Sequence, residues 1–291
     1  MINLEWYRIF RQTARTGNLT KAAQDLYITQ PSVSYAIKQM EQALGVKLFQ
    51  RLSKGVKLTA EGRALLDYVE RSFALLDSGE KKIEALKRLE DGEVRIGASD
   101  SLIKHLLLPQ LNTFHTDYPN VRIRLSHGRT PDIIRRLKED LIDCGIVHMP
   151  VSDPELDIKP LIRSEDVFVA GETYRHMAGS PLSAEELVRL PLLLLSSGSS
   201  TRSFVEQWFA SQGLAVEPDI ELGSIDLLIE FARLGYGVAF INRSFVAEEL
   251  SAGRLIELQP AAEMPSRSIG LAIRRGRMLP LAAERFIGML V

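Results

Sequence analysis

The sequence predicts a multidomain fold with an α-helical winged helix-turn-helix at its N-terminus, then a long linker helix, then a C-terminal α/β domain. Three observations support this division. The chain has 291 residues, more than one ordinary domain holds. Residues 1–58 carry nine Lys or Arg and only three Asp or Glu. Residues 92–291 alternate strand and helix patterns, which is typical of a largely parallel sheet covered by helices.

The charge is unevenly distributed along the chain. The formal net charge is −1, yet residues 1–58 are strongly basic and the remainder is acidic. A basic head on an acidic body suggests a polyanionic partner for the head alone.

The head begins with two short helices. Apolar side chains at helical spacing predict a helix over Leu4–Thr16, and Gly17 follows it as a stop. A second helix is expected over residues 20–26, where two adjacent alanines allow another helix to cross closely.

A third helix is expected between Thr29, which can cap it, and Gly45, which ends it. Pro31 fits its first turn, where a missing N–H costs little. Val33 and Met40 recur at the spacing of an inner face. Residues 46–58 then predict a small hairpin, or wing, with its turn at 53–55.

The outer face of the third helix and the wing carry side chains suited to nucleic acid. Gln and Ser hydrogen-bond base edges, Lys meets phosphate or guanine, and Tyr offers a hydroxyl and an apolar ring. The candidate DNA-binding residues are Thr20, Thr29, Gln30, Pro31, Ser32, Ser34, Tyr35, Lys38, Arg51 and Lys54. A plainer alternative is a solvated polar face on a scaffold used for protein contacts. The basic charge favours double-stranded DNA as the partner.

Residues 59–91 predict a long linker helix capped by Thr59. Its apolar side chains fall on one heptad seam. The seam residues are Leu66, Val69, Phe73, Leu76 and Ile83. A thin helix must bury such a seam, and pairing of residues 59–89 with a second copy, as a homodimer, is the simplest solution. The alternative is packing against the chain's own body.

The elements of the C-terminal domain are predicted from alternating strand and helix patterns in the sequence. Strands are expected at 94–97, 121–125, 144–147, 167–170, 192–195, 237–241 and 268–273, and helices at 103–115, 131–139, 203–212, 226–234 and 281–290. The single cysteine, Cys144, lies in an apolar strand and is interpreted as a core residue.

The N-terminal residues resemble the signature of LysR-type transcriptional regulators. The matching stretches are residues 18–23 (NLTKAA), 29–34 (TQPSVS), Ile37, Met40-Glu41, 44–51 (LGVKLFQR) and 58–62 (LTAEG). Tyr35 departs from the pattern, because many members carry a basic residue there. The resemblance implies that residues 1–58 bind DNA, that 59–91 dimerise, and that 92–291 form a two-lobed, periplasmic-binding-protein-like effector-binding domain. It also implies a homotetramer.

The resemblance further implies that subdomain I comprises residues 92–161 and 267–291 and subdomain II residues 162–266, with a ligand cleft between them. Three Ser/Thr-rich segments follow strands and precede helices, so their hydroxyls and amides suit a small anion. The candidate effector-binding residues are Ser99, Asp100, Ser101, Thr130, Ser197, Gly198, Ser199, Ser200 and Arg202. Each segment taken alone also fits a plain helix cap.

Other classes of protein fit less well. The longest apolar run, residues 190–195, is too short to span a bilayer, and no secretory signal is visible, so a cytoplasmic location is expected. No nucleophile, acid–base constellation, metal-ligand spacing or cofactor motif stands out, so we expect no catalysis, metal or cofactor. A transport solute-binding protein or an enzyme on the same two-lobed body remains the alternative, and neither explains the basic head.

Overall fold

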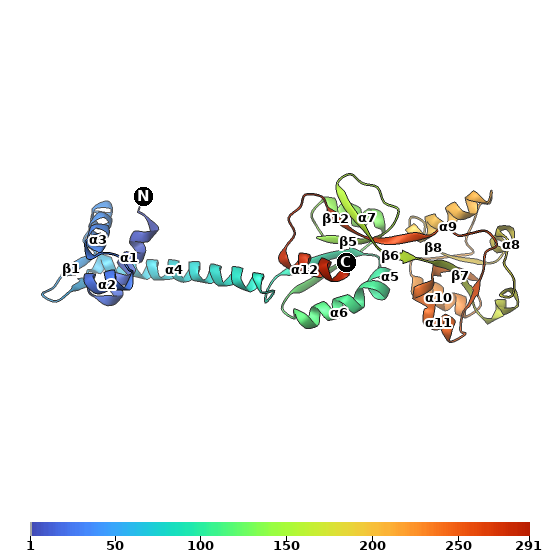
Figure 1. Cartoon of the computed structure of the whole chain (residues 1–291), viewed down its shortest axis with the longest axis horizontal. Coiled ribbons are helices and arrows are strands. Elements are labelled where there is room, and N and C mark those ends of the chain that lie inside the picture. Colours follow the sequence, from blue (N-terminus) through green and yellow to red (C-terminus); the bar gives the residue numbers. More distant parts are fainter. Residues whose placement is uncertain (1) are drawn as a thin grey trace. The chain divides into compact units, whose positions relative to one another are not determined.

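The computed structural model describes residues 2–291, and the chain forms two compact units, Met1–Glu84 and Ala85–Val291 (Figure 1). Each unit has its own core. Across the described residues, no helix is both long and apolar enough to cross a membrane.

The first unit contains the helices and the hairpin predicted for the head. Its elements are α1 (Leu4–Thr16), α2 (Leu19–Asp25), α3 (Gln30–Leu44), β1 (Phe49–Arg51), β2 (Val56–Leu58) and most of α4 (Ala60–Lys87). Asn18 caps α2 and Thr29 caps α3 through side-chain oxygens that accept backbone N–H groups. Gly45 ends α3 in the left-handed conformation. The expected ends of these three helices are confirmed to within one residue.

The wing is fixed to the end of α1. The Val56 amide donates to the Gly17 carbonyl at 2.8 Å, and Gly55 turns the chain with φ +93°. A Cβ on Gly55 would lie 2.3 Å from the Gly17 oxygen, so only glycine fits this close approach. The position of the hairpin tip therefore depends on Gly55.

The apolar seam of α4 is divided between two roles. Leu66, Val69 and Phe73 pack into the core of the head, and the Arg11 guanidinium stacks over the Phe73 ring at 4.1 Å. Beyond that point Leu76 and Ile83 are about half exposed. Packing against the chain's own body thus accounts for the first half of the seam, and the second half stays open.

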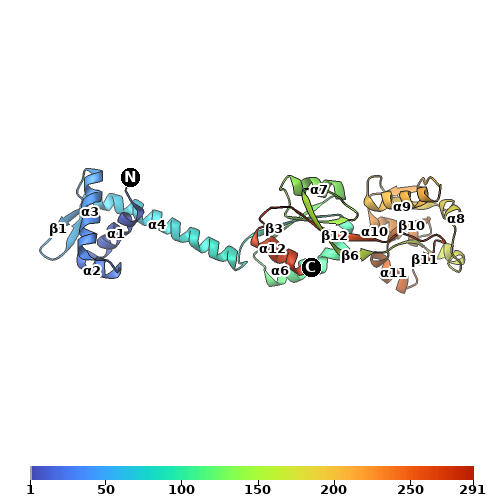
Figure 2. The same cartoon turned by 45° about the horizontal axis from the view of Figure 1, so that its top comes forward.

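The second unit consists of two α/β lobes, each built on a five-stranded sheet. Lobe I has the strands β3 (Glu93–Ala98), β4 (Arg122–His127), β5 (Cys144–His148), β6 (Leu156–Ser164) and β12 (Arg267–Arg274). Its helices are α5 (Asp100–Leu102), a π-helical turn (Ile103–Leu107), α6 (Leu108–Asp117), α7 (Thr130–Lys138) and α12 (Leu281–Leu290). Figures 1 and 2 show α7 on one side of this sheet and α6 with α12 on the other.

Lobe II has the strands β7 (Asp166–Ala170), β8 (Leu192–Leu195), β9 (Ile220–Leu222), β10 (Val238–Asn242) and β11 (Ile256–Leu258). Its helices are α8 (Ala184–Val188), α9 (Ser200–Ser211), α10 (Ile225–Arg233) and α11 (Ala247–Ser251), with 3₁₀ turns at Glu172–Met177 and Arg243–Val246. Helix α9 covers one side of the sheet, and α10 and α11 lie on the other (Figure 2).

The two sheets share one topology. Their strand orders are β4-β3-β5-β12-β6 and β9-β8-β10-β7-β11. Within each described sheet a single strand runs antiparallel to the others, β12 in lobe I and β7 in lobe II. In both cases it is the strand that the chain forms directly after it crosses over from the other lobe. The expected largely parallel architecture is confirmed.

Some elements were not expected from the sequence, namely β6, β9, β11, α8 and α11. Strand β6 lies at a sheet edge and carries Pro160 together with Asp157, Lys159 and Arg163, so it lacks the apolar run of a buried strand. The helix expected at 103–115 begins earlier, at Asp100, because the Ser99 side chain caps it, and it contains the π-helical turn.

A buried polar cluster lies where the chain passes between the lobes. Arg267 forms an ion pair with Asp166, and these side chains are 3% and 1% exposed. Arg267 also donates to the Thr201 hydroxyl at 3.0 Å and stacks over the ring of Phe204. Because Thr201 and Phe204 belong to α9, the crossover strands fix the first turn of that helix.

Candidate functional site

Two surfaces have the geometry of a functional site, and the first is the outer face of α3. Val33, Ala36, Ile37 and Met40 are buried, which turns the remaining positions outward. Tyr35 is 60% exposed, and Lys38, near the middle of the helix, is also exposed. The Gln30 side-chain amide donates to the Ser34 hydroxyl at 2.8 Å, which orients both polar groups on this face.

The cations of this surface have no acidic partner among the described residues. Lys38, Arg51 and Lys54 are exposed, and none of them forms an ion pair there. By contrast, Arg15 is paired with Glu70 on α4. Unpaired exposed cations near a helix that presents polar side chains suit the phosphate backbone of DNA.

Glu41 couples α3 to the wing. Its carboxylate accepts the amides of Leu48 and Phe49 at 2.9 and 3.3 Å and the Lys47 ammonium at 2.7 Å. Burial by itself raises the pKa of Glu41, but the hydrogen bonds from Lys47, Leu48 and Phe49 outweigh it and hold the pKa below its usual value. The wing therefore starts from a fixed position relative to α3.

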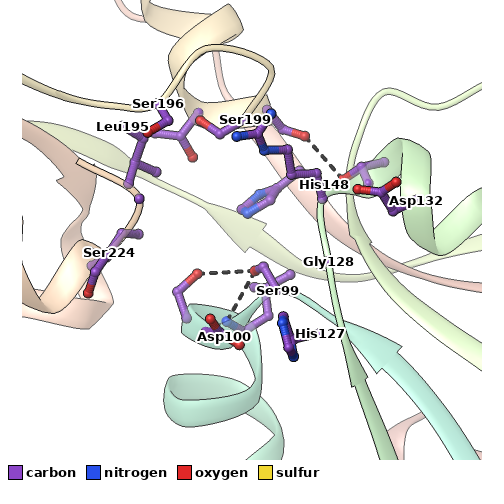
Figure 3. A pocket seen from close by; sticks show the side chains of 18 of the residues that line it. Ser99, Asp100, His127, Gly128, Asp132, His148, Leu195, Ser196, Ser199 and Ser224 are labelled. Atoms are coloured by element: carbon purple, nitrogen blue, oxygen red, sulfur yellow. Dashed lines mark hydrogen bonds between the residues drawn. The ribbon is translucent and has the colours of Figure 1, made fainter. Parts of the chain in front are cut away.

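The second surface is a cavity of about 420 Å³ between the two lobes (Figure 3). Its size lies within the range of about 300–1,000 Å³ that is usual for small-molecule sites. Its lining includes Ser99, Asp100, Ser101, Leu102, His127, Gly128, Arg129, Thr130, Asp132, Ile146, His148, Leu195, Ser196, Ser199, Ser200, Thr201, Gly223, Ser224, Ile225 and Asp226.

Many of these residues lie at the carboxyl ends of the parallel strands of the two sheets. In lobe I, β3, β4 and β5 end just before or at Ser99, Gly128 and His148. In lobe II, β8 and β9 end before Ser196 and Gly223. The first turns of α7, α9 and α10 follow, so unpaired backbone N–H groups surround the cavity.

Most of the candidate effector residues line this cavity. Ser99, Asp100, Ser101, Thr130, Ser199 and Ser200 do so, and the hydroxyls of Thr130 and Ser200 hydrogen-bond across the lobes at 3.1 Å.

Three candidates do not line this cavity, although one of them, Gly198, lines a smaller adjoining cavity together with Thr130 and Ser200. Ser197 is exposed beside the cavity and does not line it. Gly198, with φ +82°, faces the Arg129 side chain of the other lobe, whose Nη1 atom would lie 2.8 Å from an added Cβ. Arg202 is 7% exposed and forms ion pairs with Glu206 and Glu221, so its charge is engaged away from the cavity.

Several lining residues were not singled out from the sequence. His127, His148 and Ser224 are examples. Ser224 caps α10 as Ser99 caps α5, but the short strand β9 before it gives no clear pattern. His127 and His148 end β4 and β5, and their position at strand ends was the available signal.

The cavity is polar but contains one unpaired guanidinium. Asp226 is paired with Lys104 at 2.6 Å across the lobes, and Asp132 with Arg135 at 3.3 Å. Arg129 is exposed to the cavity and has no carboxylate partner among the described residues. Asp100, a third lining carboxylate, also forms no ion pair among the described residues, so the free cation for a ligand's anionic group is on the Arg129 side of the cavity.

Two partly buried histidines flank the cleft. Burial lowers the pKa of His148 to about 4, and the charge of Arg267 acts in the same direction while Asp166 opposes it. Burial also lowers the pKa of His105, whose ring stacks on Phe245 of lobe II at 4.5 Å between centroids. Both imidazoles are therefore neutral near pH 7.

The described residues contain no group of three or more His, Cys, Asp or Glu side chains placed to hold a metal ion. Cys144 is buried, and burial raises the pKa of its thiol to about 12, so it is not a reactive thiolate.

Comparison with known proteins matches both units. Residues 4–63 match the family model for the bacterial regulatory helix-turn-helix protein of the lysR family, and residues 87–291 match the LysR substrate binding domain. The HTH-type transcriptional activator CmpR of Synechocystis sp. is 29% identical over 99% of this chain and 94% of its own.

Solved structures show the same fold along the whole chain. A full-length OxyR from Pseudomonas aeruginosa covers 100% of both chains with a TM-score of 0.81 at 21% identity. Full-length CbnR in complex with its target DNA covers 99% of this chain and 98% of its own, with a TM-score of 0.69 at 20% identity.

Proposed function

The chain belongs to the LysR family of transcriptional regulators, and we propose that its DNA binding is controlled by a small anionic metabolite held between its two lobes. The family comprises regulators that bind DNA and carry a ligand-binding domain, and its members are not enzymes. The observation that carries the proposal is the cavity itself, where hydroxyls and helix N-termini from both lobes surround the unpaired Arg129. That combination suits an oxyanion.

On the DNA side, we propose that the recognition surface consists of Thr20, Thr29, Gln30, Pro31, Ser32, Ser34, Tyr35, Lys38, Arg51 and Lys54. The exposed outer face of α3 and the three cations without acidic partners support this assignment. Tyr35 and Lys38 are in position for bases or phosphates, and the wing residues Arg51 and Lys54 for the backbone or the minor groove. Such a regulator acts on chromosomal DNA, so we place it in the cytoplasm.

We further propose that two copies pair through residues 59–89 and that dimers assemble into a tetramer. The exposed second half of the α4 seam supports the pairing, since Leu76 and Ile83 are about half exposed and Leu75, next to the seam, is 75% exposed. We propose that residues 1–58 form the DNA-binding domain, residues 59–91 the dimerising linker and residues 92–291 the effector-binding domain.

DNA binding is tested by gel retardation on the chain's own upstream DNA at two salt concentrations. Retardation at low salt that weakens at high salt is expected, because phosphate contacts release counterions. Absence of retardation at low salt would overturn the DNA assignment.

The effector site is tested with Thr130→Val, which keeps the side-chain shape and removes the hydroxyl that meets Ser200 across the lobes. A thermal-shift screen of organic acids, amino acids and inorganic anions first identifies a binding anion. The variant should bind that anion at least about tenfold more weakly while keeping basal DNA binding. Thr113→Val on α6, outside the lining residues, is the matched control. Unchanged affinity by calorimetry would remove Thr130 from the site.

A further inference from the structure

An ion pair joins the two lobes beside the cavity. The Lys104 ammonium of lobe I lies 2.6 Å from the Asp226 carboxylate of lobe II and donates a hydrogen bond to it. The two residues are 122 positions apart in the sequence, so the fold alone brings them together. Asp226 lines the cavity, whereas Lys104 does not. Lys104 therefore acts on the cavity through Asp226.

The segment that carries Lys104 makes a second contact with lobe II. Lys104 and His105 belong to the π-helical turn Ile103–Leu107, which lies between α5 and α6. The His105 ring stacks on the ring of Phe245, with 4.5 Å between centroids and an interplanar angle of 19°. His105 Nε2 lies 3.9 Å from the Asp226 oxygen that Lys104 binds. Single π-helical turns inside longer helices are frequent at functional sites, and this one is the part of lobe I that meets lobe II here.

Asp226 lies in the first turn of α10, among residues that form the cavity wall. Ser224 caps this helix, and Ser224, Ile225 and Asp226 all line the cavity. A side chain that holds Asp226 therefore holds this part of the lobe II wall against lobe I. The hydrogen bond between Thr130 and Ser200 is a separate contact between the lobes.

The exposure of the Lys104–Asp226 pair makes it releasable. These side chains are 55% and 53% exposed, so water and salt compete with the interaction. By contrast, Arg267 and Asp166 are almost completely buried at the crossover, where breaking their pair would leave a buried charge. The crossover is thus the fixed connection between the lobes, and the Lys104–Asp226 pair is a contact that can open and close.

We propose that Lys104 is a positioning residue of the cavity: it holds the lobes closed through Asp226, and they open when this ion pair is broken. The inference concerns the lobes of the LysR substrate binding domain themselves and does not depend on the charge of the effector. An exposed ion pair changes an equilibrium by about two- to fivefold, and this is the expected effect of Lys104 on the ratio of closed to open lobes.

The test measures the separation of the lobes in the full-length chain without any ligand. Spin labels are attached at two exposed positions, Asn112→Cys on α6 and Ala252→Cys at the end of α11, in a Cys144→Ala background. The labelled chain is diluted with an excess of unlabelled chain, so pulsed electron paramagnetic resonance reports distances within one copy. Relative to the unsubstituted Lys104, Lys104→Met should raise the fraction of longer distances about two- to fivefold.

A series of charge variants separates an electrostatic role from a purely structural one. Lys104→Arg should keep the wild-type distances, and Lys104→Glu should open the lobes further than Lys104→Met, because two carboxylates then face each other. Lys104→Glu combined with Asp226→Lys should restore the shorter distances. Arg233→Met is the matched control, because Arg233 pairs with Glu230 at similar exposure on α10 but within lobe II, and it should leave the distances unchanged.

Salt provides an independent readout. Raising NaCl from about 0.05 M to about 0.5 M should shift the wild type towards the distances of Lys104→Met and leave that variant unchanged, since only the charged pair is screened. Identical distances in wild type and Lys104→Met, no recovery in the charge swap, or the same salt response in both proteins would each overturn the role of Lys104. None of these outcomes bears on the proposed anion site, because no ligand is present in the measurement.

Discussion

Protonation of His148 should destabilise the second unit in mildly acidic solution. In the folded chain the pKa of this imidazole is about 4, against an ordinary value of 6.5. Between about pH 6.5 and pH 4, His148 is therefore protonated in the unfolded chain but remains neutral in the folded chain. The free energy of unfolding is therefore not reduced by His148 above about pH 6.5, and it decreases as the pH falls from about 6.5 to about 4.

The size follows from the two pKa values. Between about pH 7.5 and pH 5 the difference in proton binding amounts to about 2 kcal/mol of unfolding free energy. His148→Phe does not titrate and should lose about 2 kcal/mol less over this interval. His105, whose pKa is also lowered by burial, contributes equally to both proteins and cancels in the comparison.

The assay is urea unfolding of both proteins at about pH 7.5 and pH 5, in a Trp6→Phe background. Trp208, buried in the core of lobe II, then reports on the second unit alone. Thr113→Val, which changes no titratable group, should retain the wild-type pH dependence. Equal pH dependence of wild type and His148→Phe, or an NMR titration of the His148 ring with a midpoint above 6, would refute the reasoning.

Three further predictions follow from local geometry. Gly55→Val places a Cβ against the Gly17 carbonyl at a positive φ, so it should lower the stability of the head by about 1–3 kcal/mol and weaken DNA retardation, while calorimetry shows the second unit unchanged. Glu41→Gln should lower the unfolding free energy of the head by about 1–3 kcal/mol near neutral pH, because Glu41 loses its charge. As the pH falls through the lowered pKa of Glu41, the stability of the wild type should approach that of the variant. Equal stability of the two at pH 7 would contradict the role of Glu41 in holding the wing. Cys144 should resist iodoacetamide at pH 8 in the folded chain and react in urea, as followed by mass spectrometry, because burial raises its pKa to about 12; alkylation without denaturant would contradict its burial.

The sequence was sufficient to predict those structural features that depend only on residues close together in the chain. The ends of α1, α2 and α3 follow from Gly17, Asn18, Thr29 and Gly45, whose effects reach only a few residues. The helical spacing of Val33, Ile37 and Met40 identified the buried face of α3, and with it the outward residues proposed to meet DNA. A plain helix cap was the alternative interpretation of the Ser/Thr-rich segments, and Ser99 and Ser199 do cap α5 and α9.

The candidate cavity was only partly predictable, because it depends on which strands end side by side. Arg202 follows a Ser-rich loop and was expected to face the ligand, yet α9 turns it towards Glu206 and Glu221. Arg129 has the free guanidinium instead, since Gly198 of the other lobe leaves it room. No pattern near either residue in sequence distinguishes these two arginines.

The sequence by itself determined that this chain has a basic helix-turn-helix head, a long helix and an α/β body, because caps, helical spacing and charge are properties of short segments. The division of that body into two lobes was expected only from the resemblance to LysR-type regulators. Only the tertiary structure decided that half of the α4 seam is covered by the head, that Arg129 is unpaired, and that His148 is neutral. Those outcomes depend on burial and on charges brought together by the fold, such as Arg267 and Asp166, which lie more than one hundred residues apart in the chain.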